Sequence, residues 1–433
     1  MNADDLSGNP RRYVTFTVFY NARAYYPVLA ILFLDLGLTL DQFVMLNLVW
    51  AATIFLFEVP SGALADTLGR RTLLIAASFL MVLEMSLLLL APRDGGAWLW
   101  WMCVANRICS GLSEAFASGA DEALAYDSLP DANKESSWDQ VLGTAMRWRS
   151  VGFVVAMILG SMTYDPRWWN EVAPAALEVS KEFAQRIPTA LVLMQAIACV
   201  WISWRMVEPR PVFKSSWKTA FIIASIKTIE TAKRVVVHPQ MFAVIMIGVC
   251  IDGVVRNVAT LTSSYYRLID LPEWTFGFIG AAIGLLNWFV PSVAKALNQR
   301  FSTFGNLLVA GLLAVAALAL LTPAWPIFGL LPVMMAMMTL GYLSFTISRA
   351  LHREAESAIR ATVLSVKGLI FNLGYGTFSF LFAKGLAQAS LDESRSPLQT
   401  VLIWQAPLFA LLLAGIFLWG WRQWNQPRHS NDQ

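Results

Sequence analysis

Charged residues are scarce in this sequence. Only 14% of its 433 residues are Asp, Glu, Lys or Arg, against about 25% in a typical soluble domain. Hydrophobic residues make up 57%, and the mean hydropathy is +0.55. A soluble protein of this composition would have too little polar surface to cover itself, so we expect an integral membrane protein. The net charge of +3 is small and the basic residues are not clustered, which argues against nucleic-acid binding.

Residues that usually carry catalysis or metal binding are also few. The four cysteines lie in apolar stretches and form no CxxC pair, so we expect them to be packing residues. The three histidines have neither metal-ligand nor catalytic-triad spacing. No GxxxxGK[ST] loop occurs, which argues against ATP-driven transport by this chain alone. We therefore expect no enzyme activity, no cofactor and no metal. The cysteines are Cys103, Cys109, Cys199 and Cys250, and the histidines are His238, His352 and His429.

Long apolar runs dominate the rest of the chain. A bilayer core of about 30 Å needs about 20 apolar residues per helix, and twelve segments meet that length. Residues 1–12 are polar, and the run after them is too long for a signal peptide, so we expect it to remain as the first helix. The predicted spans lie near 13–36, 42–61, 72–91, 97–122, 141–164, 188–206, 240–262, 274–297, 305–322, 325–348, 361–386 and 398–421.

The distribution of Lys and Arg predicts the orientation of these spans. Basic residues are more frequent in the loops on the side of the N-terminus, which places both termini in the cytoplasm. The longest loop on that side, 207–239, has apolar residues at near-helical spacing among lysines, which is typical of an amphipathic helix on the membrane surface. We expect this linker to separate an N-terminal six-helix bundle, 1–206, from a C-terminal one, 240–433.

The loop between the second and third spans carries a specific motif, GALADTLGRR, at 62–71. Gly62 and Gly69 permit close helix approach or a tight turn, and Asp66 can pair with an arginine or a helix N-terminus. A plain basic loop would also satisfy the positive-inside rule, but it would not need this spacing. The motif resembles the signature loop of the major facilitator superfamily, a group of secondary transporters.

That resemblance implies an all-α integral membrane protein with twelve transmembrane helices in two six-helix bundles. It also implies that the loop latches one conformational state. The residues that would form this conformational gate are Gly62, Asp66, Gly69, Arg70 and Asp121. Asp121 is the first choice for the acid at the end of the fourth span that partners this loop, and Asp127 is the second.

The fourth span carries a polar stripe. Arg107, Glu114 and Asp121 are among polar residues that recur every three or four positions on one helix face, and such a stripe cannot face lipid. The spacing of Arg107, Gly111 and Ala115 resembles the family's span-4 motif, which is linked there to proton coupling. An ion-pair seam that only holds helices together is the alternative. We expect Glu114 and Asp252 to take part in proton coupling.

Isolated polar residues in other spans predict a solute site. In the family that this chain resembles, spans 1, 4, 7 and 11 line the central cavity, and their candidate residues here are Asn21, Arg23, Arg107, Asp252, Arg256, Lys367 and Asn372. Because the basic residues outnumber the acidic ones, we expect an anionic or zwitterionic solute with Arg23 as its main anchor. Two alternatives stay open. Asp252 and Arg256, four positions apart, can simply pair, and internal neutralisation would leave a neutral solute.

The sequence thus predicts a secondary transporter that moves a small organic solute by alternating access, coupled to protons. We expect a functional monomer in the lipid bilayer of a bacterial inner membrane, without a nucleic-acid partner. The fifth span has no proline between Val141 and Tyr164, which weakens assignment to the drug/proton antiporter branch. A transporter-like sensor or scaffold without translocation is the alternative.

Overall fold

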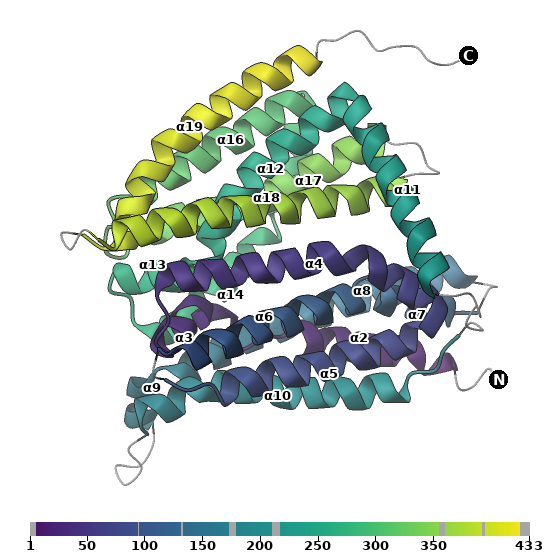
Figure 1. Cartoon of the computed structure of the whole chain (residues 1–433), viewed down its shortest axis with the longest axis horizontal. Helices are drawn as coiled ribbons and strands as arrows, with labels where there is room; N and C mark the ends of the chain where they lie inside the picture. Colours follow the sequence, from purple (N-terminus) through teal and green to yellow (C-terminus); the bar gives the residue numbers. More distant parts are fainter. Residues whose placement is uncertain are drawn as a thin grey trace. The chain divides into compact units, whose positions relative to one another are not determined.

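The structure is a computed structural model of the whole chain, and it describes residues 6–93, 95–130, 133–172, 179–209, 217–354, 360–391 and 395–424. These residues form helices, and no strand occurs among them. The fold class predicted from the sequence, an all-α protein, is therefore confirmed. Two compact units divide the chain, and each is described separately below (Figure 1).

Unit 1 comprises residues 1–225 and 266–284. Within it, α6 packs against both α4 and α5, α5 packs against α10, and α2 packs against α8. The short segment 266–284 follows α12 in the sequence but belongs to this unit. The helices that lie wholly in unit 1 are α2 (Asn9–Asn21), η1 (Tyr26–Val28), α3 (Leu29–Asp35), α4 (Leu40–Leu68), α5 (Arg70–Leu89), α6 (Ala97–Ala117), α7 (Ala120–Asp127), α8 (Lys134–Tyr164), α9 (Pro166–Val172), α10 (Lys181–Arg205) and η3 (Glu273–Thr275).

Unit 2 comprises residues 226–265 and 285–433. Its central helix is α12 (Pro239–Thr260), which packs against α16, α17, α18 and α19. The others are α15 (Val290–Arg300), α16 (Thr303–Leu321), α17 (Leu330–Glu354), α18 (Arg360–Ala389) and α19 (Pro397–Trp424). Three helices cross a boundary between the units: α11 (Trp217–Val237), α13 (Thr262–Leu268) and α14 (Phe276–Asn287). The division at 207–239 that the sequence predicts stays a prediction.

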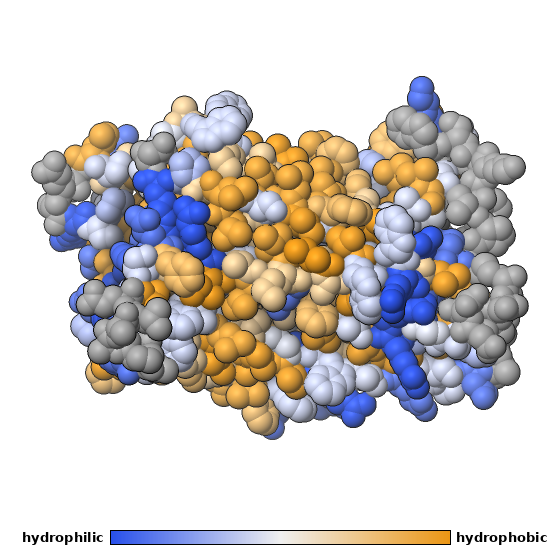
Figure 2. Space-filling model, turned by 90° about the horizontal axis from the view of Figure 1, so that it is seen from below, coloured by the Kyte–Doolittle hydropathy of each residue, from blue (hydrophilic) through white to orange (hydrophobic). Residues whose placement is uncertain are grey.

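Within the described ranges, nine helices are long and apolar enough to cross a membrane. A tenth span arises if the pair Glu273–Asn287 and Val290–Arg300, bent by 41°, counts as one. The two predicted spans outside this set are the first, which is broken, and the fourth, whose helix carries Arg107 and Glu114. On the face shown in Figure 2, hydrophobic side chains occupy the middle and hydrophilic ones gather toward both ends, as a bilayer-spanning surface requires.

The first predicted span, 13–36, is interrupted at residues 22–25. Pro27 has no N–H to donate to the carbonyl of Arg23, and proline restricts the residue before it, so a continuous helix is disfavoured here. The interrupted segment packs closely against α8, because a methyl group added at Gly160 would overlap the carbonyl of Ala24. The break therefore lies buried in the protein, where broken helices are tolerated in membranes, and it places Arg23 on irregular backbone.

All four cysteines are buried and unpaired. The linker contains one described helix, α11, whose exposed side chains include Ile222, Ile226 and Ile229 as well as Lys218 and Lys233. Both apolar and charged side chains of this helix thus face away from the rest of the described protein. That this helix lies on the membrane surface stays a prediction.

Candidate functional site

Unit 1 contains a buried ion pair between spans 1 and 3. Arg23 Nη1 lies 2.9 Å from Glu84 Oε2, and the two side chains are 4% and 0% exposed. Arg23 also donates to the carbonyl of Tyr20 at 3.2 Å, and the Tyr25 hydroxyl donates to Glu84 Oε1 at 3.2 Å. The predicted main anchor therefore has a counter-charge, supplied by a glutamate that the predicted site residues do not include.

Arg107 approaches the same glutamate from α6. Its Nη2 is 4.0 Å from Glu84 Oε1, and its Nε donates to Asn106 Oδ1 at 2.9 Å. Asn106 in turn donates to the backbone carbonyl of Glu84 at 2.7 Å. Two arginines thus share one carboxylate, and Arg107 Nη2 is buried without a hydrogen-bond partner among the described residues.

The remaining predicted residues of unit 1 are not part of this network. Asn21 donates to the carbonyl of Thr17 at 2.7 Å, within its own helix. Glu114, toward the end of α6, has an exposed side chain, and its carboxylate has no hydrogen bond or ion pair among the described residues. A carboxylate without a fixed partner in a membrane helix is available for a proton or a cation.

In unit 2 the predicted residues of spans 7 and 11 do come together. Arg256 Nη2 lies 2.5 Å from Asp252 Oδ2, and Arg256 Nη1 donates to Asn372 Oδ1 at 3.2 Å. The ion pair that the spacing of four positions predicts between Asp252 and Arg256 is therefore present. Lys367 is half-buried, with its Nζ 4.8 Å from the centre of the Phe371 ring. It has no ion pair among the described residues.

Most of the signature motif is helical, so the loop between α4 and α5 is shorter than the motif. Helix α4 continues to Leu68, and Gly69 alone, with φ of 91°, turns the chain into α5. Only glycine adopts such a φ without strain, which explains this glycine of the motif. Gly62 lies within α4, where an added methyl group would meet nothing within 4 Å. The side chain of Asp66 lies outside the described residues.

Arg70 contacts the end of the fourth span. It forms an ion pair with Asp127 and donates to the carbonyl of Ala123 at 2.7 Å. The partner of Arg70 is thus the second-choice acid: Asp121 instead accepts from the backbone N–H of Glu122 at 2.7 Å. The preference for Asp121 was wrong for this pair, because α6 ends at Ala117 and the turn at Gly119 begins a new helix, α7, whose other end carries Asp127.

The neighbouring Arg71 joins this end of α5 to the segment after α10. Its backbone N–H donates to Glu208 Oε2 at 2.9 Å, and its side chain donates to the carbonyl of Trp204 at 2.8 Å. Burial raises the pKa of the Glu208 carboxyl, although the hydrogen bond from Arg71 opposes that shift.

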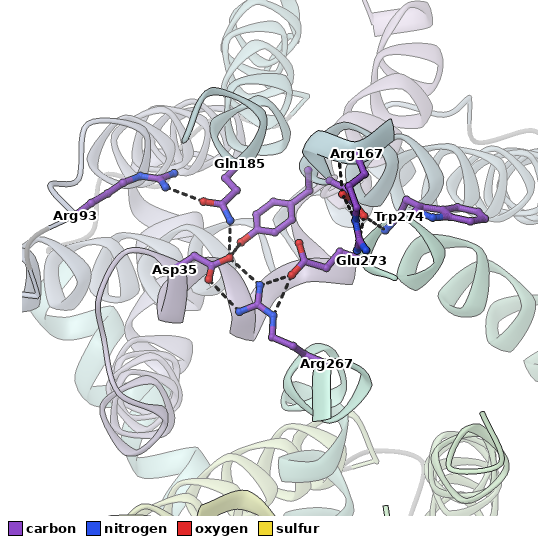
Figure 3. Close-up of polar contacts among 9 residues, drawn as sticks. Asp35, Arg93, Arg167, Gln185, Arg267, Glu273 and Trp274 are labelled. Carbon is purple, nitrogen blue, oxygen red and sulfur yellow. Dashed lines mark hydrogen bonds and ion pairs between the residues drawn. The ribbon is translucent and has the colours of Figure 1, made fainter. Parts of the chain in front are cut away.

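A second polar cluster, which was not predicted from the sequence, lies where α3 ends (Figure 3). Asp35 accepts hydrogen bonds from Tyr164 and Gln185, both at 2.6 Å, and from Arg267 at 2.9 and 2.8 Å. Arg267 also pairs with Glu273. Burial alone would lower the pKa of Arg267, but the hydrogen bonds that it donates to Asp35 and the negative charge of Glu273 outweigh burial, so the pKa is raised and the guanidinium stays charged.

Two further contacts fix the segment that carries Arg267 and Glu273. Ser161 donates to the carbonyl of Trp274 at 2.9 Å, and the Trp274 N–H faces Asp165 at 3.4 Å. A methyl group at Gly277 would overlap the carbonyl of Met157 on α8. The segment 266–284 is therefore packed closely as well as paired electrostatically. No group of three His, Cys, Asp or Glu that could hold a metal ion occurs in the described part of the chain.

Comparison with known proteins identifies this architecture. The family model described as Major Facilitator Superfamily matches residues 13–379. No curated protein matches the chain. Because the family match covers most of the chain, the protein belongs to the major facilitator superfamily. It is therefore a multi-pass membrane transporter and not an enzyme.

Solved structures share the fold at low sequence identity. The nucleoside transporter NupG has a TM-score of 0.73 at 11% identity, over 99% of this chain and 100% of its own. A POT family transporter in complex with 5-aminolevulinic acid has a TM-score of 0.66 at 13% identity, over 95% and 96%. A bacterial homolog to the human lysosomal transporter Spinster has a TM-score of 0.64 at 14% identity, over 97% and 96%. At these identities the likeness shows the fold alone.

Proposed function

We propose that this transporter moves a small organic solute with at least one negative group, by alternating access and with proton coupling. The observation that carries the proposal is the charge balance among the predicted site residues of unit 2. Arg256 and Lys367 supply two positive charges against one negative charge on Asp252, and the Arg256 side chain is 27% exposed. A surplus cation in a membrane helix is costly, and an anionic group on the solute would offset that cost.

The two arginines of unit 1 among the predicted site residues are less suited to this role. Arg23 and Arg107 both face Glu84, and Arg23 is 4% exposed. An anion that approached Arg23 would have to compete with a carboxylate already held at 2.9 Å. We therefore assign the main contact with the negative group to Arg256 and Lys367, with Asn372 orienting Arg256. Arg23 remains a second candidate.

Glu114 supports the proton-coupling part of the proposal. Its side chain is exposed on α6 and has no ion pair among the described residues, so it can exchange a proton without first breaking an internal contact. Asp252, already paired with Arg256, is the second candidate for coupling.

Uptake into proteoliposomes under an imposed pH gradient tests the proposal. A panel that contrasts carboxylates with their amides, and includes nucleosides and 5-aminolevulinic acid, separates anionic from neutral solutes. We expect a carboxylate to be preferred, and we expect Arg256→Ala and Lys367→Ala each to lower its uptake at least tenfold.

Lys384 offers a matched control on the same helix as Lys367. It is exposed, and its Nζ lies 5.6 Å from the Phe380 ring, a contact like that of Lys367 with Phe371. Lys384→Ala should transport like the wild type. Equal uptake of carboxylates and amides would contradict the anionic solute, and no uptake of any solute by folded protein would favour the sensor or scaffold alternative.

Orientation and assembly are part of the same proposal. We propose that both termini are cytoplasmic, in a bacterial inner membrane, and that the monomer is functional. Cysteines introduced at positions 3 and 430 should be protected from an impermeant thiol reagent in intact cells. Labelling of either position from outside would refute this topology.

A further inference from the structure

Unit 2 has an apolar groove on the side of α18 and α19 that carries exposed side chains. Its walls include Leu381, Trp404 and Leu408, which are 60%, 67% and 62% exposed, and its floor reaches Val254 of α12, which is 3% exposed. The cavity volume is about 530 Å³, within the range of sites that hold small molecules. The groove is therefore deep enough to hold a ligand and is more than a shallow irregularity of the surface.

The length of the groove matches one leaflet of a bilayer. Its lining extends from Phe378 to Ala389 on α18 and from Thr400 to Leu412 on α19. At 1.5 Å per residue these stretches are about 16 and 18 Å long. Half of a hydrocarbon core of about 30 Å is about 15 Å. An extended acyl chain from one leaflet would thus fill the groove along its length.

Polar groups gather at the end of the groove where α18 stops and α19 begins. Thr400, in the first turn of α19, has a buried Oγ1 without a hydrogen-bond partner among the described residues. Its hydroxyl could donate to an ester carbonyl. Arg395 is exposed two positions before α19 begins, and its guanidinium would pair with a lipid phosphate at this end of the groove. The arrangement complements a molecule with a phosphate, an ester and an apolar chain, in that order.

We propose that this groove is a binding site for one bilayer glycerophospholipid, with an acyl chain between α18 and α19 and its ester group at Thr400. The site is independent of the solute pathway but contacts a helix that carries it. Phe378 lines the groove and packs against α12, where a methyl group at Gly253 would overlap its ring. Gly253 directly follows Asp252, so a bound lipid would support the part of α12 that presents Asp252 and Arg256.

Native mass spectrometry of the full chain in detergent, titrated with phosphatidylglycerol, tests the site. We expect one lipid to remain bound through delipidation that removes the others. Gly385→Leu should fill the groove and lower the affinity for that lipid about tenfold, because the added side chain occupies the chain's volume. An added methyl group at Gly385 meets only Val401, at 3.5 Å, so the variant should fold.

Gly415→Leu is the matched control, because Gly415 lies exposed on α19 and an added methyl group there meets nothing within 4 Å. It should retain lipid like the wild type. Equal retention by Gly385→Leu and the wild type, or equal loss in Gly415→Leu, would overturn the proposal.

Two conservative variants test the orientation of the lipid. Thr400→Val keeps the shape but removes the hydroxyl, and it should weaken lipid binding several-fold. Gln405 lies deeper in the groove, and its Oε1 also lacks a partner in the described part of the chain. Gln405→Leu should therefore bind the acyl chain at least as tightly as the wild type. Weaker binding by Gln405→Leu would mean that the occupant hydrogen-bonds at this depth and is not an acyl chain.

Discussion

Asp35 accepts hydrogen bonds from both terminal guanidinium nitrogens of Arg267, a residue 232 positions later in the chain. The bidentate geometry is the strongest form of a charged hydrogen bond. It fixes the segment 266–284 to unit 1, although that segment continues directly from α12, which belongs to unit 2.

Removing this pair should loosen the segment. Asp35→Asn keeps the shape but removes the charge, and we expect a loss of about 1–2 kcal/mol in stability, because Arg267 is only 34% exposed. Thermal unfolding of the purified protein in detergent measures it. Arg167→Lys is the control: Arg167 also pairs with an aspartate, but it is 65% exposed, and such a pair contributes little. Equal losses of stability in both variants would mean that the Asp35 contact stabilises the protein no more than an exposed ion pair does.

Glu84 should be among the most sensitive polar positions. Glu84→Gln would leave Arg23 and Arg107 buried without their shared counter-charge, a change that costs about 3–5 kcal/mol. The double variant Glu84→Gln with Arg23→Gln removes one of the two uncompensated charges and should recover part of that loss. A strictly additive double variant, measured by thermal unfolding, would show that Arg23 and Glu84 are not coupled.

Arg23→Lys separates a structural charge from a solute anchor. A lysine can keep an ion pair with Glu84, but it cannot replace a bidentate contact with a carboxylate. Since Arg23 faces Glu84 in the structure, we expect uptake within about threefold of the wild type. Uptake more than tenfold lower, in a variant of unchanged stability, would return the anchor role to Arg23.

The pair of Arg70 and Asp127 should affect conformational switching more than binding. Asp127→Asn weakens the contact between the start of α5 and the end of α7, far from the middle of the spans. We expect slower uptake, roughly tenfold, with equilibrium solute affinity within a few-fold. Asp121→Asn should have the smaller effect on uptake, and the reverse order would restore Asp121 as the gate residue. Asp66→Asn is expected to behave like Asp127→Asn.

Two glycines of α8 provide a test of helix packing. Gly160→Ala would force a methyl group into the carbonyl of Ala24, at the break in the first span, and should cost several kcal/mol. At Gly143 a methyl group meets nothing within 4 Å, so Gly143→Ala should be neutral or stabilising by up to about 1 kcal/mol. Thermal unfolding compares them. Similar stability of the two variants would contradict the close approach at Ala24.

Local features of the sequence predicted much of this molecule. The apolar runs located the helices because span length is set by the bilayer, and the pair of Asp252 and Arg256 followed from helical spacing alone. The break at residues 22–25 was not predicted, although Pro27 was a visible signal for it.

Contacts between distant parts of the chain could not be predicted in the same way. Glu84 lies 61 positions from Arg23, and Asp35 lies 129 and 150 positions from Tyr164 and Gln185. The hydrophobic periodicity of a sequence does not predict which helices pack together. The partner of a charged residue in one span could therefore not be identified in another span. The same holds for Arg267, whose two acidic partners, Asp35 and Glu273, lie on separate elements.

The burial of Cys103, Cys109, Cys199 and Cys250 has a practical consequence. Polar thiol reagents should find no accessible native target in the folded protein. A single cysteine placed at an exposed position would then carry the only reporter dye or spin label, without prior removal of the native thiols. The natural chain is in this sense ready to report local conformational change at that position during turnover.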